Sequence, residues 1–174
     1  MLTRLGLFDG RPESRRAALL DFCSEILGVA RSRLGLAHDP LGAPLLLVDG
    51  APGEWSVSSS SREDVCLFGL ARSVRIGVDV EIVRPIEPPD VALHLRERTR
   101  LTGAPIDAFY ELWTLKEAYV KALGVGFRRD LAQIEVLGAA PVLREFGRPV
   151  ALADARLWRE RVGAKTVMCA ALTL

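Results

Sequence analysis

The sequence contains few cysteine, histidine and aromatic residues, and its charges nearly cancel. Its 174 residues include three cysteines and two histidines, and 6% are aromatic. The cysteines form no CxxC pair and have apolar neighbours, which favours reduced core thiols over disulfide bridges and suggests a cytoplasmic protein. The formal net charge of +1 provides no overall field that would attract nucleic acid.

Long hydrophobic runs are also missing. The longest uncharged apolar stretches, residues 45–48 and 167–174, are far shorter than a membrane span, and Arg4 and Asp9 interrupt the apolar start of the chain. We therefore expect neither secretion nor membrane insertion. Since 49% of the residues are hydrophobic, the chain can form one sizeable core, and we expect one compact unit.

Helical spacing of apolar residues occurs in three segments. Residues 14–36 contain no proline and predict a long amphipathic helix, with Gly35 near its end. Asp90 is placed to cap a second helix through Arg98. The third predicted helix covers residues 106–123 and ends at Gly124.

Branched and aromatic residues between these segments predict strands. Three adjacent antiparallel strands are expected at residues 55–58, 65–71 and 74–82, and three more in the tail at 131–137, 155–158 and 166–172. Residues 40–53, which contain three prolines and three glycines, predict a loop with at most one short strand. The order of helix, strands, helices and strands indicates an α+β fold.

Two carboxylates share one face of the strand at residues 76–82. Side chains alternate along a strand, so Val78, Val80 and Ile82 point one way while Asp79 and Glu81 point the other. The simplest interpretation is a solvated face, which is common in antiparallel sheets.

A third carboxylate borders the buried stripe of the helix at 106–123. Glu117 lies one turn after the apolar Trp113, where a buried carboxylate needs a partner. Lys121, four residues later, could provide it as an ordinary surface ion pair. Considered with Asp79 and Glu81, however, Glu117 completes a set of three acidic groups.

Three carboxylates without a nearby histidine or cysteine cluster predict a magnesium site and disfavour zinc. We place His38 and His94 on the surface or in loops. Lys116 and Lys121 flank Glu117 and could neutralise phosphate oxygens beside the metal, which indicates a phosphoanhydride substrate.

Two segments, Gly77-Val-Asp-Val-Glu81 and Trp113-Thr-Leu-Lys-Glu-Ala-Tyr-Val-Lys121, resemble the paired signature motifs of the 4'-phosphopantetheinyl transferase superfamily. The Arg-Pro-Ile segment ending at Ile86, the aromatic lead-in from Phe109 and the trailing Gly-Val-Gly also look like the family. The resemblance covers roughly residues 55–127. About 75 residues precede the first motif, as in the longer, surfactin-synthetase-activating branch.

The resemblance implies a pseudo-duplicated α+β fold with halves 1–75 and 76–174, acting as a monomer that binds coenzyme A and Mg²⁺ between the halves. The implied reaction transfers 4'-phosphopantetheine from coenzyme A to a serine of an acyl or peptidyl carrier protein. Two alternatives remain open. The chain could bind carrier protein without catalysis, or it could be a magnesium-dependent phosphohydrolase.

The resemblance also implies residue roles. Asp79, Glu81 and Glu117 would hold the metal, with Glu117 as the base, and Lys121 would contact the phosphates and assist proton transfer. The implied coenzyme A contacts are Arg16, Ser58, Ser59, Ser60, Lys116 and Lys121. The sequence departs from the family at Ser59, where the family has histidine, at Ala43, where it has lysine, and in lacking most of a basic N-terminal segment.

Overall fold

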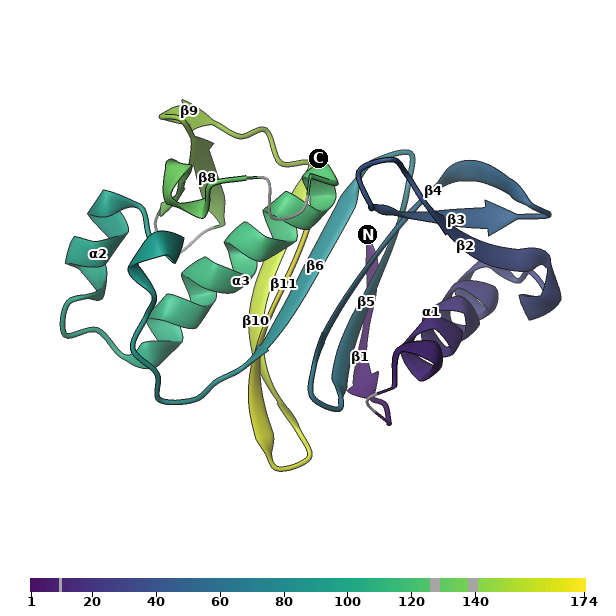
Figure 1. Cartoon of the computed structure of the whole chain (residues 1–174), viewed down its shortest axis with the longest axis horizontal. Coiled ribbons are helices and arrows are strands. Elements are labelled where there is room, and N and C mark those ends of the chain that lie inside the picture. The colour runs from purple at the N-terminus through teal and green to yellow at the C-terminus, as the bar shows by residue number, and fades with distance from the viewer. Residues whose placement is uncertain (10, 126–128, 138–140) are drawn as a thin grey trace.

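Two antiparallel sheets pack face to face, and a helix covers the outer face of each (Figure 1). The computed structural model describes residues 1–9, 11–125, 129–137 and 141–174. The first sheet has the order β1-β5-β4-β3-β2. Its strands are β1 (Leu2–Leu7), β2 (Leu34–His38), β3 (Pro44–Val48), β4 (Ala51–Arg62) and β5 (Val65–Arg72).

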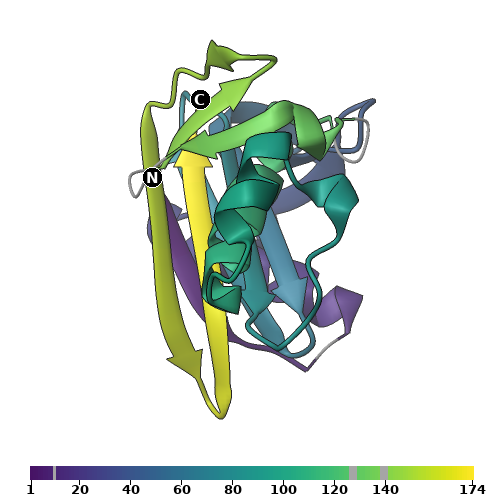
Figure 2. The same cartoon turned by 90° about the vertical axis from the view of Figure 1, so that its left-hand side faces the viewer.

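The second sheet has the order β10-β11-β6, and a small third sheet has the order β7-β8-β9 (Figure 2). Their strands are β6 (Ile76–Ile82), β7 (Ile134–Leu137), β8 (Val142–Glu145), β9 (Arg148–Pro149), β10 (Asp154–Val162) and β11 (Lys165–Thr173). The helices are α1 (Pro12–Leu27), α2 (Leu95–Leu101) and α3 (Ile106–Leu123), with short 3-10 turns η1 (Arg31–Arg33), η2 (Asp90–Ala92) and η4 (Leu131–Gln133). The predicted α+β class is confirmed.

The core consists of three apolar layers, one between the two sheets and one under the helix that covers the outer face of each sheet. The layer between α1 and the first sheet includes Phe22 and Phe68. The layer between the two sheets includes Leu67 and Val80. The layer between the second sheet and α3 includes Leu115. Each sheet is therefore buried on both faces, and any polar side chain on an inner face needs a partner.

Strand β6 has the two faces that its alternation predicts. Val78 and Val80 point into the layer between the sheets, whereas Asp79 and Glu81 point toward α3. The sequence allowed this acidic face to be solvated, but the structure covers it with α3, and both carboxylates are buried.

Gly77 allows α3 to approach β6 closely. A Cβ atom at Gly77 would lie 1.8 Å from the Ala118 carbonyl oxygen and 2.5 Å from the Ala122 nitrogen. Real Cβ atoms do not come so near to backbone, so only glycine fits here. The contact fixes where α3 crosses the strand.

Serines of β4 join the two sheets. The outer edge of β6 has backbone N–H groups without a strand partner, and such groups need an acceptor when buried. The Ser56 hydroxyl accepts from the Ile76 N–H at 3.2 Å, and the Ser58 hydroxyl accepts from the Val78 N–H at 3.1 Å. The expectation that residues 74–82 continue the sheet of the two preceding strands is therefore wrong, because β6 pairs with β11.

The first helix is shorter than predicted. It ends at Leu27, where Gly28 adopts the left-handed conformation with φ of 63°. The apolar residues that appeared to continue it belong to β2, where Leu34 and Leu36 alternate with Gly35. Gly35 is a strand residue and does not end the helix.

The segment at residues 40–53, predicted as a loop with at most one short strand, contains more strand than expected. It contains β3 and the start of β4, which begins four residues before the predicted strand at 55–58. Pro52 is accommodated where the register between β3 and β4 shifts. Strand β1 was not predicted, because Arg4 and Gly6 interrupt its apolar pattern.

Asp90 does not cap the second helix. Residues 90–92 form a 3-10 turn, and α2 starts later with His94 as its N-cap. The His94 side chain accepts from the Arg96 N–H, while Glu97 accepts from the His94 N–H, a reciprocal capping box. His94 thus has a structural role at a helix start.

Helix α3 begins and ends where the sequence predicts, with Gly124 in the left-handed conformation at its C-terminus. Gly126, in the trailing motif, lies outside the described residues. In the tail, the strands predicted at 155–158 and 166–172 form the longer hairpin β10–β11, and only residues 134–137 of the segment 131–137 are strand. Within the described ranges, no helix is both long and apolar enough to cross a membrane.

A methyl group at Gly77 tests the contact between β6 and α3. We expect Gly77→Ala to destabilise the protein by about 3 kcal/mol or more, because α3 must move off the strand. The melting temperature should fall by roughly 6–12 °C. Gly6→Ala in β1 is the matched control, since its Cβ would meet nothing within 4 Å. Equal melting temperatures for the two variants would contradict the close contact.

Candidate functional site

A cluster of charged side chains lies between β6 and α3, beside the end of β4. The Trp113 Nε1 donates to Glu81 Oε1 at 2.9 Å, and the Lys121 Nζ donates to Asp79 Oδ1 at 2.7 Å. Trp113 and Lys121 are eight residues apart on α3, and Glu117 lies midway between them on the same face. The helix thus brings its signature residues onto the two carboxylates of β6.

Asp79 is the most deeply buried member of the cluster, with 0% exposure. Its Oδ1 accepts from Lys121 and from the Ser60 hydroxyl, the latter at 2.8 Å. Its Oδ2 is buried and has no hydrogen-bond partner among the described residues. A buried carboxylate oxygen without a partner is unfavourable, so this atom is a candidate ligand for a cation.

Glu117 is 9% exposed and faces the same cluster. Burial raises the pKa of its carboxyl above the ordinary value, and the nearby negative charges of Asp79 and Glu81 raise it further. Lys121 and Arg62 partly offset this rise in the pKa. The three carboxylates therefore interact electrostatically.

Arg62, the last residue of β4, was not identified from the sequence. Its Nε donates to Glu81 Oε2 at 2.6 Å and its NH2 group donates to Glu81 Oε1 at 2.5 Å. This two-pronged ion pair is the strongest type of hydrogen-bonded pair available to a carboxylate. The periodicity of the sequence could not reveal the pairing of Arg62 with Glu81, because β4 and β6 meet only through the packing of the two sheets.

The cluster combines oxygen donors with nearby cations. Within the described ranges, no three histidine, cysteine, aspartate or glutamate side chains have the arrangement of a formed metal site. The all-oxygen donor set and the unpartnered Asp79 Oδ2 nevertheless fit a hard cation such as Mg²⁺. The residues present are therefore compatible with magnesium and unsuited to zinc.

Lys116 is not part of this cluster, which corrects the prediction that it binds the cofactor. Its side chain is fully buried on another face of α3. The Nζ donates to Glu97 Oε2 at 2.5 Å, to the Ala92 carbonyl at 3.0 Å and to the Leu131 carbonyl at 3.1 Å. Burial lowers the pKa of Lys116, and the Glu97 hydrogen bond opposes that shift. The three N–H groups of the Lys116 ammonium thus bond to neighbouring elements and hold them against α3.

The predicted coenzyme A contacts lie in different places. Ser60 is buried between Asp79 and Lys121, and its hydroxyl bonds to both. Ser58 and Ser59 line a cavity beside Lys121. Arg16 donates from its NH2 group to the Leu36 carbonyl at 2.9 Å, which places its guanidinium against β2.

The cavity beside Lys121 has a volume of about 220 Å³. His38 and Lys121 line it together with Ser58 and Ser59, and none of its lining residues is acidic. Two basic groups with hydroxyls around the same space favour an anion. His38, which the sequence assigned to the surface, therefore borders the candidate site. Gly42, Ala43 and Pro44 form another part of the wall.

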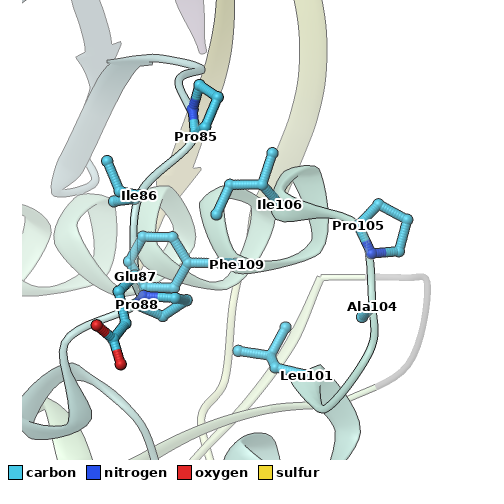
Figure 3. A pocket seen from close by; sticks show the side chains of 9 residues that line it. All are labelled: Pro85, Ile86, Glu87, Pro88, Leu101, Ala104, Pro105, Ile106 and Phe109. Carbon is cyan, nitrogen blue, oxygen red and sulfur yellow. The ribbon is translucent and has the colours of Figure 1, made fainter.

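A second cavity of about 490 Å³ lies at the other end of α3 (Figure 3). Ile86, Ile106 and Phe109 surround it, with prolines of the segment after β6 and of the start of α3. None of the predicted site residues lines this cavity. Phe109 stacks on Trp113 with ring centroids 6.0 Å apart. This stacking connects the wall of the second cavity to the charged cluster.

Both signature segments fall within residues 75–164, which match the family model described as the 4'-phosphopantetheinyl transferase superfamily. The chain belongs to this superfamily. The segment matched extends from the start of β6 to the β10–β11 turn and includes all of α3. Asp79, Glu81 and Glu117 all lie inside it.

Individual relatives carry the same superfamily name. A putative 4'-phosphopantetheinyl transferase of Synechocystis is 30% identical over 135 residues, which are 68% of this chain and 51% of the relative. The 4'-phosphopantetheinyl transferase HetI of Nostoc is 29% identical over 129 residues, 70% of this chain and 54% of the relative. A phosphopantetheinyl transferase of Xenopus laevis named for L-aminoadipate-semialdehyde dehydrogenase is 44% identical over 45 residues, 26% of this chain and 15% of the relative. The chain spans about half the length of the first two relatives.

Replacing Lys116 tests its structural role. We expect Lys116→Met to destabilise the protein by about 3–5 kcal/mol, because Glu97 loses its buried cationic partner. Lys165→Met is the control, since Lys165 pairs with the half-exposed Glu63 and its loss should cost less than about 1 kcal/mol. Denaturant unfolding measures both. A Lys116→Met protein of normal stability that fails to bind coenzyme A would restore the role predicted from the sequence.

The raised pKa of Glu117 predicts that its charge destabilises the fold when no cation is added. Stability from a carboxyl with a raised folded-state pKa is full below its unfolded pKa and is lost as the pH rises through the folded pKa. Glu117→Gln should therefore raise the melting temperature near pH 8, by roughly 2–4 °C, and have little effect near pH 4.

The exposed Glu111 on the same helix provides the matched control. Glu111→Gln should leave the melting temperature unchanged at both pH values, within about 1 °C. Thermal unfolding followed by circular dichroism measures the difference. A lower melting temperature for Glu117→Gln near pH 8 would show that the fold stabilises the ionised carboxylate.

Proposed function

We propose that the chain is a magnesium-dependent enzyme that transfers the 4'-phosphopantetheine group of coenzyme A to a serine of an acyl or peptidyl carrier protein. The observation that carries this proposal is the packing of α3 on β6, which gathers Asp79, Glu81, Glu117 and Lys121 into one cluster. Membership of the superfamily supports the same conclusion.

Coenzyme A would bind with its phosphates along Lys121. The Lys121 ammonium already donates to Asp79 and to Ser60, and it also lines the 220 Å³ cavity. One ammonium can thus connect the carboxylate cluster to a phosphate in that cavity. His38 lines the same cavity as Ser59, so its imidazole could replace the histidine that the family has at the position of Ser59.

Magnesium would be held by the carboxylates of Asp79, Glu81 and Glu117. When bound, it would supply positive charge beside the diphosphate, where the transition state of phosphoryl transfer needs it. The protein's own cations, Lys121 and Arg62, pair with the carboxylates of Asp79 and Glu81. With three carboxylates against these two cations, the cluster would need the bound metal to attract a phosphate substrate.

Glu117 is the residue suited to accept the proton of the attacking serine. Burial raises its pKa, so its carboxylate binds a proton more readily than an exposed one. In the proposed step, the serine oxygen bonds to the β-phosphorus of coenzyme A while the bond to the leaving 3',5'-ADP breaks. The serine proton passes to Glu117, and Lys121 stabilises the phosphate charge.

We place the chain in the surfactin-synthetase-activating branch, with halves 1–75 and 76–174. The residues proposed for catalysis belong to the second half, and those proposed for the nucleotide end, His38, Ser58 and Ser59, belong to the first. Since one chain contributes both groups, we also propose that it acts as a monomer.

Asp79→Asn and Glu117→Gln should each reduce transfer at least about 100-fold. The first removes a charged acceptor at the buried end of the cluster, and the second removes the proposed proton acceptor. Mass spectrometry of an apo carrier protein incubated with coenzyme A and magnesium measures the gain of one phosphopantetheine group. Glu111→Gln, which changes the same helix outside the cluster, should transfer at the normal rate.

Three outcomes would contradict the proposal. Undiminished labelling by both cluster variants would remove the assigned roles. Binding of coenzyme A by the normal protein without any labelling would indicate a carrier-binding protein that lacks catalysis. Release of phosphopantetheine in the absence of carrier would indicate a phosphohydrolase.

A further inference from the structure

The cavity beside Lys121, which we call the Ser59 cavity, adjoins another one. This neighbouring cavity has a volume of about 330 Å³, and Trp55 lines it, so we call it the Trp55 cavity. Ala43 and Lys121 line both cavities. A ligand whose phosphates lie at Lys121 can therefore extend into either cavity, and it passes Ala43 in both cases.

The two cavities together carry no excess of positive charge. Of the described residues that line them, four have a side chain of fixed charge, two of each sign: Lys121, Arg75, Asp39 and Glu54. With the imidazole of His38 counted as neutral, these charges cancel. An anion in the cavities thus gains attraction only from particular side chains and not from the wall as a whole.

Both fixed cations already have partners. Lys121 pairs with a carboxylate of the cluster, and the Arg75 NH1 group donates to the Leu123 carbonyl at 2.8 Å, at the C-terminal end of α3. That end of a helix attracts positive charge. The Asp39 Oδ1 atom accepts from two backbone N–H groups of the loop before β3, each at 2.8 Å. These bonds fix a negative charge close to Ala43.

Coenzyme A has a phosphate on the 3' position of its ribose, directly beside the diphosphate. With the diphosphate at Lys121, the 3'-phosphate lies no more than one sugar ring away, inside or at the mouth of these two cavities. There the described lining residues offer it the imidazole of His38, whereas the Asp39 carboxylate repels it. Arg16, which the sequence assigned to coenzyme A, lines neither cavity.

We infer that the enzyme has little specificity for the 3'-phosphate, and that the small neutral side chains of Ala43 and Ser59 are the reason. 3'-Dephospho-coenzyme A, which has a hydroxyl at this position, is then nearly as good a donor. The serine oxygen bonds to the same β-phosphorus, and 5'-AMP leaves in place of 3',5'-ADP. This inference rests on the proposed function, because it assumes that the diphosphate of coenzyme A binds at Lys121.

The test compares the two donors on the normal protein. Mass spectrometry of one apo carrier protein gives kcat/KM for each donor, and we expect the two values to agree within about fivefold. A fixed cation on the 3'-phosphate would by itself contribute roughly tenfold or more. Calorimetric titration with each donor, in the absence of carrier protein, gives the ratio of the two affinities without any dependence on catalysis.

A lysine at position 43 should create the missing specificity. Ala43 is only half-buried, and Ala43→Lys places an ammonium group where the two cavities meet. We expect this variant to prefer coenzyme A over its dephospho form by about tenfold or more. Ala43→Met, which adds a long side chain without charge, should keep the ratio of the normal protein. Circular dichroism confirms that both variants are folded.

The failures of the two proposals are distinguishable. A preference of the normal protein for coenzyme A above about fivefold, or an unchanged ratio in Ala43→Lys, would overturn the inference and leave the proposed transfer intact. If neither donor supports transfer, the proposed function is wrong, and the calorimetric ratio still decides the specificity. If the protein binds neither donor, both proposals are wrong.

Discussion

The close contact between α3 and β6 is the constraint on which the candidate site depends. Gly77 removes the side chain that would keep the helix away, and the backbone at Ala118 fills that space. Since side chains alternate along the strand, Asp79 and Glu81 then point at the helix. Trp113, Glu117 and Lys121 point back at them, because they are spaced by one helical turn.

Two polar networks at α3 have different purposes. Lys116 and Glu97 form a fully buried pair in which every Lys116 donor has an acceptor, and this pair fixes neighbouring elements to the helix. On the adjacent face, Glu117 and Asp79 Oδ2 are buried with less compensation. A satisfied network beside an unsatisfied one is typical of a rigid scaffold that holds a functional group in an unfavourable state.

Sequence patterns predicted the parts of the fold that depend on local periodicity. The α+β class, the extent of α3 and the two faces of β6 followed from the spacing of apolar residues and from Gly124. The first helix was too long because its apolar spacing appeared to continue into β2, although Gly28 marks the end.

The remaining features arise only from tertiary packing. No local pattern could show that β4 serines bond to the edge of β6, that Arg62 meets Glu81, or that His38 shares a cavity with Lys121. Lys116 and Lys121 look alike in sequence, but their positions on the helix separate them. The Lys116 side chain enters the core, whereas the Lys121 side chain lies between the carboxylates and a cavity.

We propose above that α3 and β6 form one divalent-cation site held by the carboxylates of Asp79, Glu81 and Glu117. Anomalous diffraction from crystals grown with coenzyme A and manganese tests it most directly, because the signal identifies the ion and its neighbours. We expect one manganese ion beside the carboxylates of Asp79, Glu81 and Glu117. A cluster without manganese, or a Glu117 carboxylate turned away from the ion, would contradict the proposed site.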